Sequence, residues 1–263
     1  DTKHIILIPS NPTECFEFSV MAFDLADRLQ TPIIILSDLD IGMNDFTTKE
    51  FKWEDTHMFD RGKVLTKKDL DSMEKFGRYL DIDGDGIPYR TYPGTHSEKG
   101  AYFTRGSSHD EYAVYTEDGK VNARNLTRIL KKHDNAAKLV PKPIIRSVNN
   151  SKGVIYFGGS DYSMIEALDE LSSDGIILDS MRIRAFPFGK EVYDFIENHD
   201  MIFVVEQNRD AQMKKLILAE VNVVPDKMIS VLCFDGMPIT AHFISTEISS
   251  YLAEKEVKEI MKK

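Results

Sequence analysis

The sequence predicts an α/β fold in which mostly parallel sheets are covered by helices on both faces. Short β-branched segments alternate with longer segments of helical periodicity, and Gly, Pro or Asn residues separate the two kinds. This alternation is typical of parallel sheets, because each crossover between parallel strands needs a connection long enough for a helix. At 263 residues and 42% hydrophobic content, the chain is long enough for two such units.

The first elements are predicted to be a strand, a helix and a second strand. Residues 5–8 form a short apolar run, and residues 33–36 form another. Between them, Asn11 suits a helix N-cap and Pro12 suits the first helical position. Glu14 stands three residues after the cap, where it can return a hydrogen bond to the backbone N–H of Asn11. These signals predict a βαβ unit.

The middle of the chain is predicted to be less regular. Residues 38–115 are rich in Gly, Asp, Thr and Tyr, and within them only residues 66–80 suggest a helix. Segments this long without regular structure are uncommon unless they are functional or cover a partner. A basic helix is predicted over residues 121–139, and the Pro-containing segment that follows, up to about residue 152, is predicted to be a linker.

The second unit repeats the α/β alternation. Strands are predicted at residues 154–157, 176–178, 201–205 and 229–232. Helices are predicted at residues 162–171, 187–198 and 210–221, with a last helix that carries Ile244, Ile248 and Leu252 on one face.

Composition excludes several classes of function. The formal charge of −10 disfavours nucleic acid and anionic membrane surfaces as partners, because both need a basic face. The apolar runs are much shorter than the ~20 residues that cross a bilayer, so no membrane span is expected. Cys15 and Cys233 are far apart, which fits a cytoplasmic protein without a disulfide framework. Two thiols are also too few for an iron–sulfur cluster, so electrons would have to leave through another subunit. The chain enters an apolar strand directly, without an initiating Met, and we expect it to be a piece of a longer chain.

An acidic turn begins like a calcium-binding loop. Asp81, Asp83 and Asp85 alternate along the chain, and Gly86 stands at the sixth position. The twelfth position holds Tyr92, where a bidentate Glu is required. The three carboxylates are candidate calcium or magnesium ligands, but the incomplete ligand set favours a rigid polar turn.

Two turns of the second unit lie where α/β sheets bind ligands. Gly158, Gly159 and Ser160 follow a strand and open a helix, a place where backbone amides can hold a phosphate. The full dinucleotide-binding fingerprint is absent, which favours a plain turn. Residues 206–208 (Glu-Gln-Asn) follow another strand, and they are interpreted equally well as ligand contacts or as a helix cap by Asn208.

Three residues of a polar loop are candidates for acid–base chemistry. His109, Asp110 and Glu111 combine an imidazole with two carboxylates, and Arg105 lies close by in sequence. Adjacent residues of an extended chain point to opposite sides, so a solvated loop is the competing interpretation. The sequence contains neither HExxH nor GxSxG spacing, and it therefore nominates no zinc site or serine nucleophile.

Several longer strings carry a resemblance to a known family. They are residues 9–17 (PSNPTECFE), 36–40 (LSDLD), 86–91 (GIPYRT), 102–106 (YFTRG), 109–112 (HDEY), 157–160 (FGGS), 184–188 (RAFPF), 205–208 (VEQN) and 235–239 (DGMPI). Together they resemble the α subunit of 2-oxoacid:ferredoxin oxidoreductases, in particular those acting on 2-oxoglutarate, and cover nearly the whole chain.

The resemblance implies a division of labour. Residues 1–140 would be the second half of a pyrimidine-type domain of the thiamin diphosphate-binding fold, and residues 153–263 a transketolase C-terminal-like domain. The family oxidatively decarboxylates a 2-oxoacid to an acyl-CoA with thiamin diphosphate, magnesium, coenzyme A, iron–sulfur clusters and ferredoxin. The implied partners are a β subunit and the remainder of the α subunit, and this chain alone would bind no cofactor and be inactive.

The composition and position of the polar loop lead to one further hypothesis. Arg105 and residues 109–111 would border the substrate channel of the assembled enzyme. The competing function is a non-catalytic binding or assembly module with a transketolase-like fold.

Overall fold

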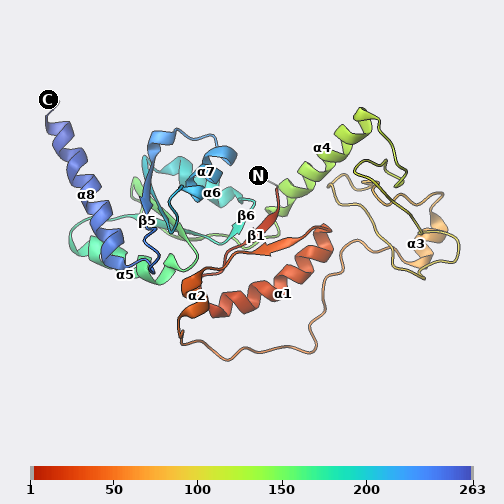
Figure 1. The fold of residues 1–263 in the computed structure, drawn as a ribbon, viewed down its shortest axis with the longest axis horizontal. Coiled ribbons are helices and arrows are strands. Elements are labelled where there is room, and N and C mark those ends of the chain that lie inside the picture. The colour runs from red at the N-terminus through yellow and green to blue at the C-terminus, as the bar shows by residue number, and fades with distance from the viewer. Residues whose placement is uncertain (1–2, 262–263) are drawn as a thin grey trace. The chain divides into compact units, whose positions relative to one another are not determined.

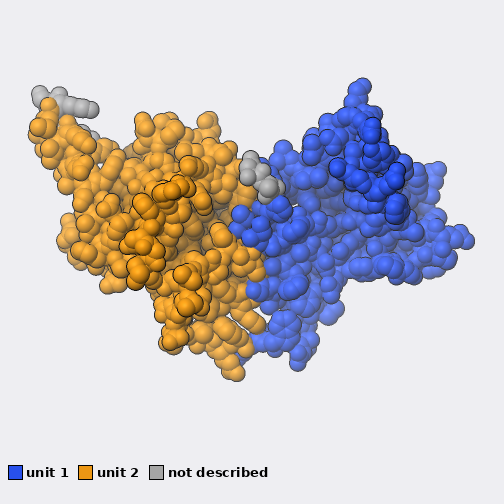
Figure 2. Space-filling view, in the orientation of Figure 1, with its two compact units in different colours: residues 1–6, 19–34, 52–140 blue, residues 7–18, 35–51, 141–263 orange. Residues whose placement is uncertain are grey.

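The computed structural model describes residues 3–261 and contains two compact units. Unit 1 comprises residues 1–6, 19–34 and 52–140, and unit 2 comprises residues 7–18, 35–51 and 141–263 (Figure 2). Two segments from the first fifth of the chain therefore belong to the same unit as its C-terminal half. The assignment of residues 1–140 and 153–263 to two named domain types stays a prediction.

The N-terminal elements form as the sequence predicts, with one difference at the helix start. Strand β1 (Ile5–Leu7), helix α1 (Pro12–Leu29) and strand β2 (Ile33–Ile35) follow in order (Figure 1). The side chain of Asn11 accepts the backbone N–H of Glu14 at 2.9 Å, which confirms the cap. The prediction that Glu14 returns a hydrogen bond to the backbone of Asn11 is wrong. The Glu14 carboxylate accepts the N–H of Ser10 at 2.9 Å and also binds the side chains of two arginines.

The excursion after β2 contains two short helices. Helix α2 (Leu39–Met43) belongs to unit 2, and helix α3 (Lys67–Ser72) belongs to unit 1. The expected helix over residues 66–80 is too long: Thr66 opens α3 with a capping box, but Met73 is already extended. Leu70 is the only buried residue of α3, so little packing favours a longer helix here.

The five-stranded sheet of unit 2 has the order β3-β5-β4-β7-β8. All neighbours are parallel except β3 and β5. The strands are β3 (Ile144–Arg146), β4 (Lys152–Phe157), β5 (Asp179–Ile183), β7 (Met201–Glu206) and β8 (Met228–Leu232). A second sheet has the order β2-β1-β6, in which β6 is Ala185–Phe186, and the N–H of Ile8 donates to the carbonyl of Arg184 at 2.7 Å.

Helices cover both faces of the five-stranded sheet. The helices of unit 2 are α5 (Ser160–Ser173), α6 (Lys190–Asn198), α7 (Gln212–Glu220) and α8 (Ala241–Ile260). On one face, Met164 of α5 and Ile244 of α8 join Val154 and Phe203 in a buried cluster. On the other face, a Cβ placed on Gly153 would lie 2.9 Å from the ring of Phe195 in α6. The predicted α/β class with a mostly parallel sheet is confirmed.

Two elements of unit 2 differ from the prediction. The strand expected at residues 176–178 lies instead at Asp179–Ile183, where it pairs with residues 153–157 of β4. All five residues of β5 are buried although three are polar, and a search for apolar runs misses such a strand. The expected linker contains β3, an antiparallel edge strand whose residues are exposed.

The remaining long helix is α4 (Gly119–Ala136) of unit 1, which lies two residues from its predicted start and three from its predicted end. Gly86 packs against it: a Cβ there would lie 2.5 Å from the backbone nitrogen of Lys132. In the described part of the chain, no helix combines the length and the apolar character that crossing a membrane requires.

We expect Gly86→Ala to destabilise unit 1 more than Gly94→Ala. Both glycines have positive φ, +87° and +83°, so both substitutions cost about 1–2 kcal/mol of backbone strain. Only Gly86 has no space for a methyl group, and the overpacking adds about 1–3 kcal/mol. Denaturant unfolding of both variants measures the difference, and equal free energies of unfolding would show that the contact with α4 is not tight.

Candidate functional site

The carboxyl edge of the five-stranded sheet is the candidate site of unit 2. Strand β5 lies on one side of β4 and β7 on the other, so the connections that leave β4 and β7 diverge at this edge. Open α/β sheets bind ligands at such switch points. The turn at residues 158–160 follows β4, and residues 206–208 end or follow β7.

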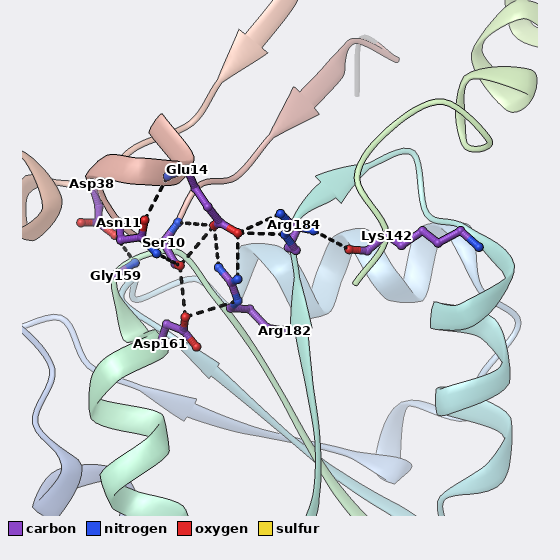
Figure 3. A network of polar contacts seen from close by, with 9 residues as sticks. All are labelled: Ser10, Asn11, Glu14, Asp38, Lys142, Gly159, Asp161, Arg182 and Arg184. Carbon is purple, nitrogen blue, oxygen red and sulfur yellow. Dashed lines mark hydrogen bonds and ion pairs between the residues drawn. The ribbon is translucent and has the colours of Figure 1, made fainter. Parts of the chain in front are cut away.

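The turn after β4 already holds an anion, the carboxylate of Asp38 (Figure 3). Asp38 Oδ2 accepts the N–H of Gly159 at 2.6 Å, and Oδ1 accepts the N–H of Ile41 at 2.9 Å as the cap of α2. A Cβ on Gly159 would lie 2.7 Å from Asp38 Oδ2, so this approach needs glycine. The Asp38 carboxylate thus occupies the backbone N–H group at which the sequence suggested a phosphate. This favours the interpretation of Gly158, Gly159 and Ser160 as a plain turn.

The residues after β7 mainly cap the next helix. Glu206 is completely buried and accepts the backbone N–H groups of Met213 and Lys214 at 2.7 and 3.0 Å. The Asn208 side chain accepts two further backbone N–H groups, those of Asp210 and Gln212, both at 3.1 Å. The arrangement supports the helix-cap interpretation of Asn208.

A cleft of about 710 Å³ opens beside this edge. Its lining consists of Asp38, Leu39, Asp40, Met43, Asn44, Gln207, Cys233, Phe234, Gly236, Met237 and Pro238. Burial and the neighbouring charge of Asp38 raise the pKa of Asp40, and burial together with Asp235 raises the pKa of Cys233. A protonated thiol is a poor nucleophile. The cleft therefore suits apolar contact better than phosphate binding or covalent catalysis.

A buried ion network centres on Glu14 (Figure 3). Arg182 of β5 binds the carboxylate with both terminal nitrogens, at 2.7 Å to Oε2 and 2.9 Å to Oε1. Arg184 donates its Nε to Oε1 at 3.0 Å. Ser10 Oγ donates to Asp161 Oδ2 at 3.1 Å, and the same oxygen lies 3.4 Å from Arg182 Nε. The network joins the start of α1, strand β5 and the start of α5 within unit 2.

The network fixes the ionisation of Glu14. Burial alone would raise the pKa of its carboxyl group, but three contacts outweigh it: the Arg182 hydrogen bonds and charge, the N–H of Ser10, and the charge of Arg184. The pKa of Glu14 is therefore lowered. Arg182 is only 5% exposed at its side chain, so neither partner is stabilised by much water.

A second buried cluster, which the sequence does not reveal, lies at the amino edge of the same sheet. Asp179 accepts the Ser147 hydroxyl and the N–H groups of Val148 and Asn150, and its Oδ2 lies 3.3 Å from His199 Nε2. Ser147 donates its hydroxyl to the carboxylate and not to the imidazole, so the cluster lacks the Ser–His contact that activates a serine nucleophile. The cluster holds the segment after β3 against β5.

The acid–base candidates lie in unit 1 and are mostly engaged within their loop. The His109 ring stacks on Tyr79 with centroids 3.9 Å apart. Asp110 Oδ1 accepts two backbone N–H groups of its own turn, and Glu111 pairs with Arg124 at 3.0 Å. The Arg105 guanidinium lies 5.7 Å from the centre of the Tyr115 ring. The structure shows no proton-transfer pair among these four residues.

The acidic turn is held by a lysine. Lys63 Nζ lies 2.6 Å from Asp83 and 2.8 Å from Asp85, and Asp81 accepts the N–H of Gly86 at 3.0 Å. No group of three or more potential metal ligands occurs in the described residues. This arrangement favours the rigid polar turn over a cation site.

Comparison with known proteins identifies relatives over nearly the whole chain. The α subunit of 2-oxoacid:ferredoxin oxidoreductase 2 from Aeropyrum pernix is 24% identical over 99% of this chain and 40% of its own length. The corresponding α subunit from Saccharolobus solfataricus is 22% identical over 98% of this chain and 40% of its own length. The resemblance to these α subunits is confirmed. No family model matches the chain.

Further matches agree with these α subunits. The 2-oxoglutarate synthase subunit KorA of Methanothermobacter marburgensis is 26% identical over 86% of this chain and 60% of its own length. A solved 2-oxoglutarate:ferredoxin oxidoreductase from Magnetococcus marinus, with 2-oxoglutarate, coenzyme A and succinyl-CoA bound, has the same fold at a TM-score of 0.80 and 21% identity. The match covers 94% of this chain and 42% of the solved chain. The chain thus spans about two fifths of the length of the Aeropyrum pernix and Saccharolobus solfataricus α subunits.

We expect Glu14→Gln to destabilise unit 2 by about 3 kcal/mol, because it removes the two-pronged counter-ion of the buried Arg182 and leaves it the more distant Asp161, at 3.4 Å. Glu17→Gln is the matched control on the same helix, since Glu17 is exposed. Chemical denaturation followed by circular dichroism measures both. Equal unfolding midpoints for the two variants would contradict a stabilising role for the ion pair.

Unit 2 should also lose stability in acid. Glu14 and Asp179 have lowered pKa values in the fold, so the unfolded chain takes up their protons at a higher pH than the folded chain. The stabilisation is complete above the ordinary carboxyl pKa and is lost as the pH falls through the lower folded values. Free energies of unfolding measured from neutral pH downward should fall less steeply for Glu14→Gln than for the wild type, and parallel curves would refute the assignment.

Proposed function

We propose that this chain is the C-terminal part of the α subunit of a 2-oxoacid:ferredoxin oxidoreductase. The observation that carries the proposal is the match to curated α subunits over 98–99% of the chain. The proposed overall reaction oxidises a 2-oxoacid in the presence of coenzyme A: carbon dioxide leaves, an acyl-CoA forms, and two electrons pass to ferredoxin.

The proposed substrate is 2-oxoglutarate. Two similarities support it: the match to the 2-oxoglutarate synthase subunit KorA and the shared fold with an oxidoreductase solved with 2-oxoglutarate bound. Both favour a five-carbon dicarboxylic oxoacid over pyruvate.

The described residues do not fit the diphosphate and magnesium of thiamin diphosphate. The Asp38 carboxylate accepts the Gly159 N–H at the helix start, where a diphosphate would bind. Lys63 forms ion pairs with Asp83 and Asp85, the candidate magnesium ligands. We propose that the β subunit and the rest of the α subunit hold thiamin diphosphate and magnesium, and that iron–sulfur clusters lie outside this chain, whose only cysteines are Cys15 and Cys233. The chain alone would then be inactive. Two separate thiols also suit the cytoplasm, where we place the complex.

We further propose that Arg105 and residues 109–111 border the substrate channel of the assembled enzyme. The loop that carries them is held by its own backbone contacts, with the Asp110 carboxylate accepting the N–H groups of Tyr112 and Val114 at 2.9 Å. A loop fixed in this way can present His109 in a constant position. Replacing His109 by Gln in the complete complex should change turnover or the affinity for the oxoacid.

The decisive test is purification of the full-length protein from its native cells, with mass spectrometry of what accompanies it. We expect a thiamin diphosphate-binding, iron–sulfur β subunit, and reduction of ferredoxin that requires both 2-oxoglutarate and coenzyme A. Pyruvate in place of 2-oxoglutarate is the control for the oxoacid, and residues 1–263 alone are the control for the need of a partner. Recovery of the protein without such a subunit would reject the enzyme and favour a binding or assembly module.

A further inference from the structure

Unit 1 contains a small cavity with an excess of positive charge. Its volume is about 260 Å³, and the side chains of Arg78, Arg128 and Lys132 line it. Arg128 and Lys132 lie one turn apart on α4, and Arg78 comes from the segment after α3. Three cations around one cavity are unusual in a chain whose formal charge is −10.

Arg78 lacks the partners that a half-buried guanidinium normally has. Its Nε and Nη1 are shielded from solvent and make no hydrogen bond. Its guanidinium carbon lies 5.1 Å from the centre of the Tyr79 ring and 5.5 Å from that of Tyr102. Aromatic faces attract a cation, but they accept its N–H groups only weakly. Such orphaned donors in a native fold usually indicate a missing acceptor.

The two cations on α4 are only partly satisfied. Arg128 donates Nη1 to the Gly86 carbonyl at 3.0 Å, but its Nε is buried and unbonded. Lys132 donates to the Gln30 carbonyl at 3.3 Å. Burial and the charges of Arg128 and Arg78 lower the pKa of Lys132 to about 8. The cations therefore repel one another in the absence of a counter-ion.

No carboxylate among the described residues forms an ion pair with the cluster. Burial lowers the pKa of Arg128, and the charge of Asp81 offsets only part of that effect. Within residues 3–261, however, no Asp or Glu oxygen pairs with Arg78, Arg128 or Lys132 within 4 Å, in contrast to Arg182, which is paired with Glu14. Unpaired charge that is partly withdrawn from water is costly, so a fold that keeps three half-buried cations around a cavity is expected to bind a negative group there.

We propose that this cavity binds a small free oxyanion, with one carboxylate or phosphate group seated among Arg78, Arg128 and Lys132. Guanidinium forks match the geometry of both groups. A neutral donor at the same cavity, the side-chain amide of Asn122, suits a remaining oxygen, whereas the Asn125 amide already donates to the His109 carbonyl. The volume limits the ligand to a small molecule, since drug-sized ligands occupy about 300–1,000 Å³. His109, which is proposed to border the substrate channel, also lines this cavity. The oxyanion site rests on the three cations and does not depend on the proposed enzyme activity.

The test is calorimetric titration of the full-length protein with inorganic phosphate and, separately, with succinate. Ionic strength is held constant with chloride, so that general screening does not mimic binding. We expect saturable binding in the millimolar range or tighter. Binding of phosphate alone or of succinate alone would identify the group, and binding of both would show a general oxyanion site.

Substitutions locate the site. Arg78→Gln should weaken binding at least tenfold, and Arg78 is suited to replacement because it makes no hydrogen bond that the fold needs. If circular dichroism shows that Arg78→Gln does not fold, Lys132→Gln is titrated in its place, and it too should bind more weakly than the wild type. Lys131→Gln removes the same charge from an exposed neighbour on α4 and should leave the affinity unchanged. Absence of saturable binding to the wild type, or equal losses in Lys131→Gln and the cavity variants, would overturn the proposal.

Discussion

The two-pronged ion pair between Glu14 and Arg182 is the interaction on which unit 2 depends. Its atoms lie 168 positions apart in sequence, with N···O distances of 2.7 and 2.9 Å. Removing two charges from water is costly, and such a pair is tolerable only when further hydrogen bonds complete it. Ser10 and Arg184 supply those bonds. The first turn of α1 is thereby fixed to β5, and it counts structurally as part of the C-terminal half of the chain.

A carboxylate from the N-terminal part of the chain also occupies the Gly159 amide at the switch point of the sheet. Asp38 lies in the second N-terminal segment that belongs to unit 2, and its carboxylate caps α2 while accepting the Gly159 amide. A phosphate at this amide would have to displace a carboxylate that already makes two backbone hydrogen bonds. The edge where α/β sheets often bind cofactors is used here to hold the chain's own segments.

The sequence is informative where local chemistry decides the structure. The Asn11 cap, the apolar strand β7 and the Ile244 face of α8 follow from patterns within a few residues, and each appears as predicted. Strand β5 could not be predicted in this way. Its buried Asp179 and Arg182 are stabilised only by partners distant in sequence. For the same reason the sequence shows Glu14 as a capping residue, whereas its main partners are arginines that no local pattern connects to it.

The candidate sites differ in whether their charged side chains are paired within the fold. Asp83 and Asp85 look like metal ligands in sequence, yet Lys63 neutralises both. Arg78, by contrast, has no sequence signature, because an isolated arginine in a polar segment is ordinary. Only its burial without a hydrogen-bond acceptor, next to two further cations, distinguishes it. A side chain whose charge is already paired within the fold has few hydrogen-bonding groups free for a ligand. The unpaired cations of unit 1 therefore indicate a ligand-binding site better than the paired carboxylates do.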